Sequence, residues 1–235
     1  MDQFVRTSLV WGNKALQKLN NTKIAIFGLG GVGSYVAEGL ARAGVGSFVL
    51  VDNDVVDITN INRQILALHS TIGQDKVSVE KSRILDINPV AIVDTHKIFC
   101  SKDSNYAILE GCSYVVDAID TISTKIALIE ECTQRNIPII SAMGAGNKLD
   151  PTLFEATDIF KTSVCPVCRV MRTELKKRGI KSLKVVYSKE KPITPNMEGY
   201  TAKLGDNKVI GSTPFVPSVV GLILANEVAK DIVKN

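Results

Sequence analysis

Residues 23–64 decide how this chain folds, and they read KIAIFGLGGVGSYVAEGLARAGVGSFVLVDNDVVDITNINRQ. An apolar run from Lys23 to Phe27 precedes a glycine-rich loop, a helical pattern up to about Ala43, and a second apolar run that ends at Asp52. A strand, a G-x-G-x-x-G loop and a helix, with an acidic residue about twenty residues later, form a dinucleotide-binding fingerprint. The stretch therefore predicts a nucleotide site on a doubly wound, Rossmann-like α/β fold with a mixed sheet.

Each glycine of this loop has a physical task. Gly28 permits the tight turn after the strand, and Gly33 allows the helix to pack closely on the strand. Gly30 and Gly31 allow backbone N–H groups to approach phosphate oxygens. Asp52 can accept hydrogen bonds from ribose hydroxyls. We expect these five residues to bind the nucleotide.

Polar residues beyond the ribose acid favour ATP over a nicotinamide cofactor. A nicotinamide cofactor has two phosphates and gives no evident task to Asn60, Arg63 or Lys76. The β- and γ-phosphates of ATP carry charge that Arg63 and Lys76 can neutralise as it develops during displacement. Asp54, Asn60, Arg63, Gln64 and Lys76 are therefore candidate ATP-binding residues, and Arg63 and Lys76 are also candidate catalytic residues.

Lys76 begins a helical pattern that continues to about Asn88. A lysine at a helix N-terminus opposes the helix dipole, which favours anions there. This position indicates that Lys76 serves a ligand rather than the stability of the helix. Further upstream, we expect Thr59 or Asn60 to be the N-cap of a helix.

An apolar run from Tyr114 to Ala118 predicts a buried strand, with Asp117 and Asp120 at its carboxyl end. Open α/β sheets bind ligands at the carboxyl ends of their strands. Magnesium binds carboxylates together with substrate phosphates, and one or two carboxylates suffice. Because Asp117 is also in position to cap the following helix, we favour Asp120 as the magnesium ligand and a further catalytic candidate. A loop at residues 144–146 is expected to lie over the site.

Five motifs occur in order along the chain and resemble those of one superfamily. They are GLGGVG at Gly28, DND at Asp52, NINRQ at Asn60, GQDK at Gly73 and VVDAID at Val115. In these motifs the chain is similar to the ThiF/MoeB/HesA superfamily, which includes the ubiquitin-activating and sulfur-carrier-activating enzymes. The resemblance implies an adenylate-forming enzyme that uses ATP, and it matches Asp120 to a metal-associated aspartate.

Within this superfamily, four further stretches look most like those of the tRNA threonylcarbamoyladenosine dehydratases. They are TNINRQILAL at Thr59, DINP at Asp86, DPT at Asp150 and RVMRTELKKRGI at Arg169. The resemblance implies an ATP-dependent loss of water that cyclises the threonylcarbamoyl group on an adenosine of tRNA. In such a reaction the carbamoyl group closes on an activated carboxylate of the same substrate, which gives proximity without an enzyme thiol.

Two other functions remain open. The first is an adenylyltransferase that activates the C-terminus of a ubiquitin-like sulfur-carrier protein, with that carrier or a sulfur-relay protein as its partner. The second is a nucleotide-binding tRNA scaffold without chemistry. A carrier that ends in Gly-Gly and becomes adenylated would support the first, and ATP binding without turnover would support the second.

We expect residues 1–22 to form an N-terminal helical arm, residues 23–160 the nucleotide-binding domain, and residues 161–235 a basic region that completes this domain as a small appendage. In the superfamily that the chain resembles, an arginine from such an arm reaches the nucleotide site of the partner subunit. Arg6 matches that position approximately, so the resemblance implies a homodimer in which Arg6 is a catalytic candidate. Taken alone, Arg6 would be a solvated surface charge.

The net charge of +4 is distributed unevenly. Residues 161–208 contain twelve Lys or Arg against four Asp or Glu, a local net charge of +8. Such asymmetry is typical of proteins that bind a polyanion such as tRNA, although a solvated helix face would carry the same charges. The N-terminus has no signal-peptide pattern and no apolar run is long enough to span a bilayer, so we expect a cytoplasmic enzyme without membrane contact.

Cys165 and Cys168 form a C-x-x-C motif at a place where the dehydratases usually have an Asp-Pro pair. The carrier-activating relatives hold zinc with two such motifs, but no cysteine follows Cys168, and Cys100, Cys112 and Cys132 lie earlier in the chain. A single chain therefore lacks an evident four-thiolate zinc site. Three interpretations remain open: a zinc ion shared between subunits, a redox pair, or two thiols without a function.

Overall fold

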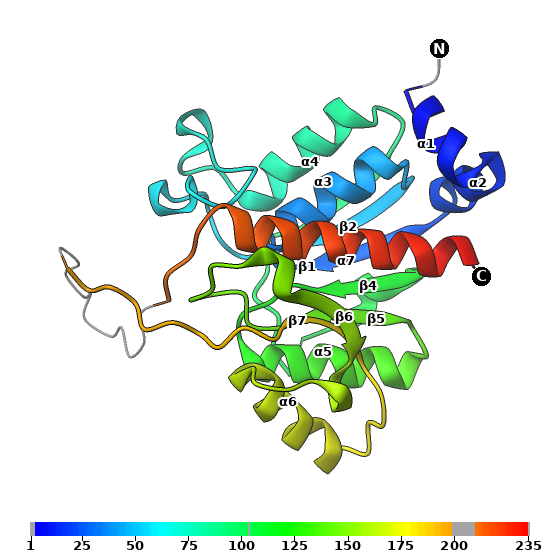
Figure 1. The fold of residues 1–235 in the computed structure, drawn as a ribbon. Coiled ribbons are helices and arrows are strands. Elements are labelled where there is room, and N and C mark those ends of the chain that lie inside the picture. Colours follow the sequence, from blue (N-terminus) through cyan, green and yellow to red (C-terminus); the bar gives the residue numbers. More distant parts are fainter. Residues whose placement is uncertain (1–2, 103, 199–209, 235) are drawn as a thin grey trace.

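A seven-stranded mixed sheet forms the centre of the molecule (Figure 1). The computed structural model describes residues 3–102, 104–198 and 210–234. Its strands follow the order β3-β2-β1-β4-β5-β7-β6, in which only β6 runs antiparallel to its neighbour β7. The strands are β1 (Lys23–Phe27), β2 (Ser47–Val51), β3 (Ile92–His96), β4 (Tyr114–Asp117), β5 (Ile139–Ala142), β6 (Phe154–Asp158) and β7 (Lys184–Ser188).

The strand order reverses at β1, which pairs with β2 on one side and β4 on the other. In this register Phe27 lies opposite both Val51 and Asp117, so the three strands end at the same level. Open α/β sheets bind ligands at such a reversal. The doubly wound α/β fold predicted from residues 23–64 is confirmed.

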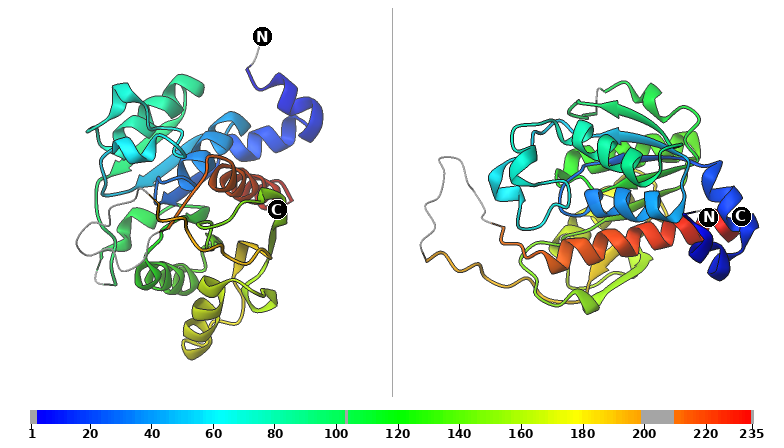
Figure 2. Two further views of the ribbon diagram at one scale, coloured as in Figure 1. Left: turned by 60° about the vertical axis from the view of Figure 1, so that its left-hand side comes forward. Right: turned by 90° about the horizontal axis from the view of Figure 1, so that it is seen from above.

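Helices cover both faces of the sheet (Figures 1 and 2). On one face lie α3 (Gly33–Ala43), α4 (Lys76–Ile87) and α7 (Phe215–Lys234), and on the other lie α5 (Ile122–Arg135) and α6 (Pro166–Lys177). Short 3-10 helices occupy Ile58–Asn60, His69–Thr71, Tyr106–Leu109, Pro151–Leu153 and Ile159–Lys161. No helix in the described part of the chain is long and apolar enough to cross a membrane.

The β1 strand is buried on both faces, which explains its nearly continuous apolar sequence. Ile24 and Ile26 belong to the core cluster that α3 and α7 complete. Ala25 and Phe27 belong to a second cluster on the opposite face, beneath α5. Because successive side chains of a strand point to opposite faces, β1 packs against the helices on both faces of the sheet.

The N-terminal arm consists of two helices, α1 (Val5–Trp11) and α2 (Asn13–Asn20), rather than one continuous helix. The chain breaks at Gly12, whose φ of 86° no helical residue adopts. Lys18 Nζ donates a hydrogen bond of 3.0 Å to the carbonyl oxygen of Val233. The α2 helix of the arm is therefore fastened to the last turn of α7, whereas the N-terminus itself lies away from the C-terminus (Figure 2, left).

Residues after 160 contribute to the same sheet. The β7 strand lies between β5 and β6, and α7 packs along α3. The described C-terminal segments are therefore part of the layered structure, and Pro217 at the start of α7 reaches the carboxyl edge of the sheet, where it lines a pocket.

Candidate active site

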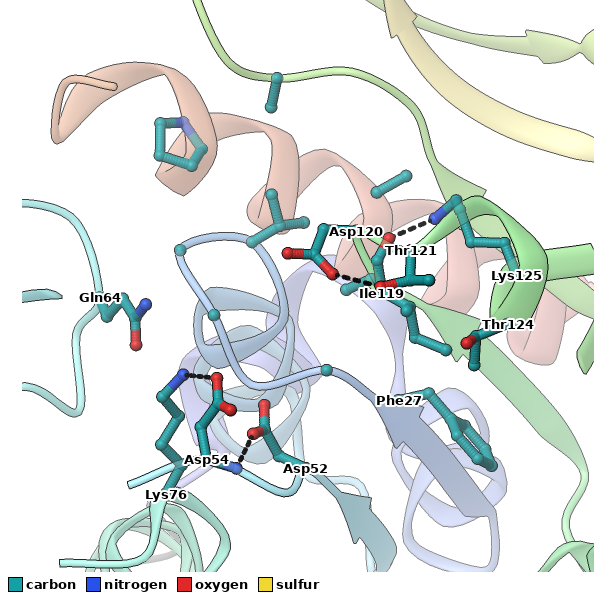
Figure 3. Close-up of a pocket in the computed structure, with 18 of the residues that line it drawn as sticks. Phe27, Asp52, Asp54, Gln64, Lys76, Ile119, Asp120, Thr121, Thr124 and Lys125 are labelled. Atoms are coloured by element: carbon teal, nitrogen blue, oxygen red, sulfur yellow. Dashed lines mark hydrogen bonds and ion pairs between the residues drawn. The ribbon is translucent and has the colours of Figure 1, made fainter. Parts of the chain in front are cut away.

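A pocket of about 500 Å³ opens at the carboxyl ends of β1, β4 and β5, where the strand order reverses (Figure 3). Small-molecule sites usually have volumes of about 300–1,000 Å³. Nine of the predicted nucleotide-binding residues line it, as does the predicted magnesium ligand. These lining residues are Gly28, Gly30, Gly31, Asp52, Asp54, Asn60, Arg63, Gln64, Lys76 and Asp120.

The glycine loop is closed by two contacts that no side chain would permit. Gly28 has a φ of 87°, and a Cβ there would lie 2.7 Å from the carbonyl oxygen of Ala118. A Cβ on Gly33 would lie 1.7 Å from the carbonyl oxygen of Gly28. Gly33 therefore acts behind the pocket, where it begins α3, and does not line it. The loop directs the N-terminus of α3 toward the pocket, which favours bound anions.

Space is available beside Gly30. The nearest atom to a Cβ at this position would be Gln64 Nε2, at 3.9 Å. Gly31 is more confined, because a Cβ there would lie 3.1 Å from the side chain of Pro217 and 3.3 Å from Arg63. The free volume for a phosphate oxygen therefore lies on the Gly30 side of the loop.

Asp52 connects the glycine loop to the segment after β2. Its Oδ2 accepts a hydrogen bond of 2.6 Å from Leu29 N–H, and its Oδ1 accepts one of 2.8 Å from Asp54 N–H. Each carboxylate oxygen has more than one lone pair. Asp52 can thus hold the loop and still accept hydrogen bonds from hydroxyl groups in the pocket.

Lys76 is the first residue of α4, and its side chain extends into the pocket (Figure 3). Its Nζ lies 2.8 Å from Asp54 Oδ2. Only 5% of the Lys76 side chain is exposed, against 57% of the Asp54 side chain. The ammonium group is therefore withdrawn from bulk solvent while its counter-ion is not, so an anionic ligand can replace Asp54 as its partner.

Asn60, Arg63 and Gln64 enter the pocket from a turn rather than from a helix. The expected N-cap at Thr59 or Asn60 is wrong, because Asp57 caps the short 3-10 helix Ile58–Asn60. Asn60 Oδ1 accepts a hydrogen bond from Asp57 N–H, which leaves its amide N–H groups as donors. In this part of the fold no long apolar pattern follows the cap, so a 3-10 turn forms in place of an α-helix.

The guanidinium of Arg63 is held by two hydrogen bonds from Nη1, to the carbonyl oxygen of Thr59 at 2.8 Å and to Asn62 Oδ1 at 3.0 Å. It does not pair with a carboxylate among the described residues. Gln64 is 6% exposed, and its buried Oε1 has no partner within the described structure. Both side chains therefore offer polar atoms to a ligand.

Asp120 follows β4 and its carboxylate points into the pocket (Figure 3). Its Oδ1 accepts a hydrogen bond of 3.2 Å from Thr121 Oγ1. A carboxylate exposed beside a phosphate loop fits magnesium, which needs one or two carboxylates and completes its shell with phosphate oxygens and water. Asp117 does not cap α5. It is fully buried and lies 2.9 Å from Lys125 Nζ.

Lys125 is the main polar residue of the pocket that the sequence analysis missed. It lies in the first turn of α5, and its Nζ donates a hydrogen bond of 2.8 Å to the carbonyl oxygen of Ile119. The helix-dipole argument that identified Lys76 applies equally to Lys125. Exposed apolar residues such as Phe99 also line the pocket, and no sequence signal marks them.

Besides Gly33, three predicted site residues lie outside the pocket. Arg6 is exposed on α1, and the preceding Phe4 lies against Gly44, at the end of α3 remote from the glycine loop. Cys165 and Cys168 are buried behind the pocket wall, at the start of α6. Across the described ranges, no group of three or more His, Cys, Asp or Glu side chains is arranged to hold a metal ion.

A glycine loop that leads into a helix N-terminus, at the point where a doubly wound sheet reverses its strand order, defines a Rossmann-like nucleotide-binding protein. The sequence assigns the chain more narrowly. It belongs to the ThiF family, whose model matches residues 4–235.

Named relatives resemble the chain over its whole length. The tRNA threonylcarbamoyladenosine dehydratase of Bacillus subtilis is 46% identical over 245 residues, which cover 100% of this chain and 96% of the relative. The solved structure of the Escherichia coli tRNA N6-threonylcarbamoyladenosine dehydratase TcdA in complex with ATP has a TM-score of 0.89 and 34% identity, covering 99% of this chain and 94% of that chain. Its complex with AMP has a TM-score of 0.90.

Proposed function

We propose that this chain catalyses the ATP-dependent dehydration of threonylcarbamoyladenosine in tRNA. The observation that carries the proposal is the 46% identity to the tRNA threonylcarbamoyladenosine dehydratase of Bacillus subtilis, which extends over the entire chain. The pocket supports it, because donors for phosphate and a carboxylate for a metal lie around one cavity. A whole-chain match favours this function over carrier-protein activation.

ATP occupies the pocket with its phosphates over the glycine loop. The N–H groups of Gly30 and Gly31 face the phosphates, and Asp52 holds the ribose. Asn60 and Gln64 offer amide groups, and Lys76 leaves Asp54 to bind a phosphate oxygen. The similarity to a protein solved with ATP and with AMP supports this arrangement.

Magnesium is the proposed metal, with Asp120 as its protein ligand. The metal would neutralise charge on the phosphates of bound ATP. Arg63 and Lys76 act at the same centre, because each presents a cation to the pocket where negative charge develops during displacement. Of the three interpretations of the cysteine pair, the shared zinc ion has no further support in the described residues.

The reaction proceeds in two balanced steps. A carboxylate oxygen of the threonyl group attacks a phosphorus atom of ATP, and either pyrophosphate or ADP leaves. The carbamoyl group of the same substrate then attacks the activated carbonyl carbon and loses a proton, and AMP or inorganic phosphate departs with the former carboxylate oxygen. The oxygen of the lost water therefore leaves in AMP or inorganic phosphate, and its hydrogen leaves as a proton from the carbamoyl group. Holding both groups in one substrate supplies the proximity.

A homodimer would bring Arg6 to a pocket. The α1 helix exposes apolar side chains, with Leu9 82% and Val10 79% exposed. Arg6 lies beyond the far end of α3, and a helix of eleven residues is about 16 Å long, so Arg6 does not reach the pocket of its own chain. We propose that these apolar residues contact a second copy and that Arg6 enters its site.

The proposed tRNA surface is the basic region that begins at residue 161. In the proposed organisation, residues 1–22 form the arm, residues 23–160 form the nucleotide-binding domain, and this basic region completes that domain. Several cations of α6 are exposed, among them Arg169 and Lys176. An exposed basic helix beside the pocket would bind the phosphates of a tRNA whose modified adenosine enters the site. A cytoplasmic location agrees with such a substrate, and a sulfur-relay protein remains a proposed partner.

Mass spectrometry of nucleosides from threonylcarbamoylated tRNA tests the function. After incubation with the chain and Mg-ATP, we expect the modified adenosine to lose one water, and to keep it when ATP is omitted. The nucleotide product identifies the phosphorus attacked, since adenylation releases AMP and phosphorylation releases ADP. An unchanged nucleoside together with adenylation of a carrier ending in Gly-Gly would replace the proposal by the carrier-activating function.

A further inference from the structure

The two late cysteines meet at the start of α6. Cys165 is the N-cap residue of this helix, and Cys168 follows three residues later. Side chains three residues apart lie on one face of a helix, with Cβ atoms about 5–6 Å apart, and a disulfide needs Cβ atoms about 3.5–4.5 Å apart, so a small local movement joins the two sulfurs. Both thiols are free and buried, with 2% of Cys165 and 0% of Cys168 exposed.

Cys165 touches the wall of the nucleotide pocket from behind. Its Sγ would lie 3.6 Å from a Cβ placed on Gly144, so the sulfur packs against the backbone of that residue. Gly144 and Val167 both line the pocket. The sulfur of Cys165 therefore packs against the loop at residues 144–146, which lines the space that ATP would fill.

The surroundings of Cys165 stabilise a thiolate. A hydrogen bond from the Cys168 thiol lowers the pKa of Cys165, as do backbone N–H groups of Cys168, Gly144 and Val167, although burial opposes the effect. Cys168 has a raised pKa because its thiol serves as the donor in this pair and is buried. Cys165 lies at the N-terminal end of α6, where the helix dipole favours a thiolate, so Cys165 is the nucleophile of the pair.

A buried cation and a strained residue accompany the pair. The Lys148 ammonium is only 2% exposed, hydrogen-bonds to the carbonyl oxygen of Glu190, and interacts electrostatically with Cys165. Val164, directly before Cys165, has a φ of 59°. For a β-branched residue this conformation is unfavourable. The fold thus holds Cys165 in a positive environment by a turn that is unfavourable by itself.

We propose that Cys165 and Cys168 form a reversible oxidation site whose disulfide state weakens nucleotide binding in the adjoining pocket. The oxidant is a peroxide of the hydrogen peroxide class. The Cys165 thiolate attacks one peroxide oxygen, which yields a sulfenic acid and releases hydroxide. The Cys168 thiol then displaces hydroxide from this sulfur, and the proton and the hydroxide leave as water. Two thiols thus lose two electrons, and a dithiol reductant returns them.

Oxidation acts on the pocket through Gly144. A disulfide holds its two sulfurs about 2.05 Å apart, so closing it draws the Cys165 sulfur toward Cys168 and changes its packing against Gly144. The loop at residues 144–146, which lines the pocket, then shifts toward the space for ATP. The coupling is reciprocal, so bound Mg-ATP should slow the oxidation. The inference rests on the proposed binding of ATP, but not on the dehydration chemistry.

The test begins with the full chain, reduced with dithiothreitol and freed of it. Mg-ATP binding is measured by titration calorimetry before and after hydrogen peroxide treatment, and peptide mass mapping locates any disulfide. We expect a Cys165–Cys168 bond, a Kd for Mg-ATP raised about 5–150-fold, the usual range for coupled sites, and recovery with dithiothreitol. Prior addition of Mg-ATP should slow formation of the bond.

A matched variant separates oxidation at this site from oxidation elsewhere. Cys165→Asp places a residue that is favoured at the N-cap of α6, and it cannot be oxidised to a disulfide. It should bind Mg-ATP with one affinity before and after peroxide. The same peroxide response in Cys165→Asp as in the original chain would overturn the inference, because other thiols would then be responsible.

Other outcomes would also overturn it. These are the absence of a Cys165–Cys168 bond after peroxide, a bond that leaves the Kd unchanged, and a zinc ion retained by the reduced chain but lost from Cys168→Ser. A reduced chain that fails to bind Mg-ATP would instead refute the proposed function, which distinguishes the two failures.

Discussion

Two buried lysines face the same pocket from opposite sides of the glycine loop, and each has an aspartate as its partner (Figure 3). Lys76 begins α4 and contacts Asp54, whereas Lys125 lies in the first turn of α5 and contacts Asp117. The aspartates differ: the side chain of Asp54 is 57% exposed and that of Asp117 is 0% exposed. A lysine–aspartate ion pair therefore occurs once with a solvent-exposed aspartate and once in the core.

The exposure of the counter-ion decides what each lysine can do. Asp54 can be rehydrated at little cost, so Lys76 is free to exchange it for phosphate. Asp117 has no route to water, and its Oδ2 has only the Lys125 ammonium beside it among the described residues. Lys125 also holds the carbonyl oxygen of Ile119, the residue before Asp120. We infer that Lys76 serves the ligand and that Lys125 fixes the segment that carries Asp120.

The largest expected effect is the loss of the buried pair. Lys125→Met should lower the free energy of unfolding by about 3–5 kcal/mol, because it leaves the Asp117 carboxylate buried without its counter-ion. Urea denaturation at neutral pH measures this change. The double variant Asp117→Asn with Lys125→Met should recover much of the loss, since it buries no charge. A single variant within 1 kcal/mol of the original chain would show that the pair is not a core element.

Lys76→Met should lower activity and leave stability almost unchanged, whereas Lys125→Met should lower stability. We expect turnover of threonylcarbamoylated tRNA to fall by about 10²–10³, equivalent to about 2.7–4 kcal/mol, as for the removal of one donor to developing charge. Its free energy of unfolding should change by only about 0–1 kcal/mol because Asp54 returns to solvent. Arg63→Ala should give the same separation. Near-normal turnover of either variant, measured with saturating Mg-ATP, would remove that residue from the phosphate site.

The sequence predicted the parts of this site that depend on local patterns. Residues 23–64 place a strand, a glycine loop and a helix in an order that few folds share, so the nucleotide site follows from them. The ligand role expected of Lys76 came from its position in a helix and remains a prediction. Lys125 offered the same signal and was missed, because only the packed structure shows that its side chain lines the pocket.

Other features depend on contacts between distant segments. Asp54 and Asp117 both stand near the end of a strand, and no local pattern shows that one is exposed and the other buried. The contact of Cys165 with Gly144 joins residues from two different loops. By contrast, the break at Gly12 follows a local signal in the sequence, since glycine is a weak helix former.

Glu80 provides a third case, a buried carboxyl group without a counter-ion. It lies one turn after Lys76 on α4, is 0% exposed, and neither carboxylate oxygen has a partner among the described residues. Burial, with a smaller contribution from Glu38, raises its pKa to about 8, against the opposing effect of Arg83. The folded state therefore binds more protons than the unfolded state between about pH 4.5 and 8.

Stability should accordingly fall as pH rises through this range, by up to about 1.4 kcal/mol for each pH unit from this group. The contribution is fully present below the unfolded pKa and is lost as pH rises through the folded value. Glu80→Gln keeps a neutral side chain of similar shape and should flatten the dependence. Urea unfolding at pH 5 and pH 8 gives the free energy of unfolding of the original chain and of Glu80→Gln. If this free energy changed equally with pH in the two proteins, the pKa of Glu80 would not be raised in the folded chain.

The smallest effect is expected on the surface around α6, where cations with an ion-pair partner can be compared with cations that have none. Lys177 and Arg178 pair with Glu174, whereas the exposed Lys176 and Lys181 have no ion pair within the described ranges. Only cations without a protein partner should contact tRNA phosphates at full strength. Lys176→Glu with Lys181→Glu should reduce the slope of log K against log salt by about 1 for each lost contact. Lys14→Glu with Lys81→Glu, an equal change of charge on α2 and α4, should leave the slope unchanged. Equal effects of both variants would mean that tRNA responds to net charge and not to this face.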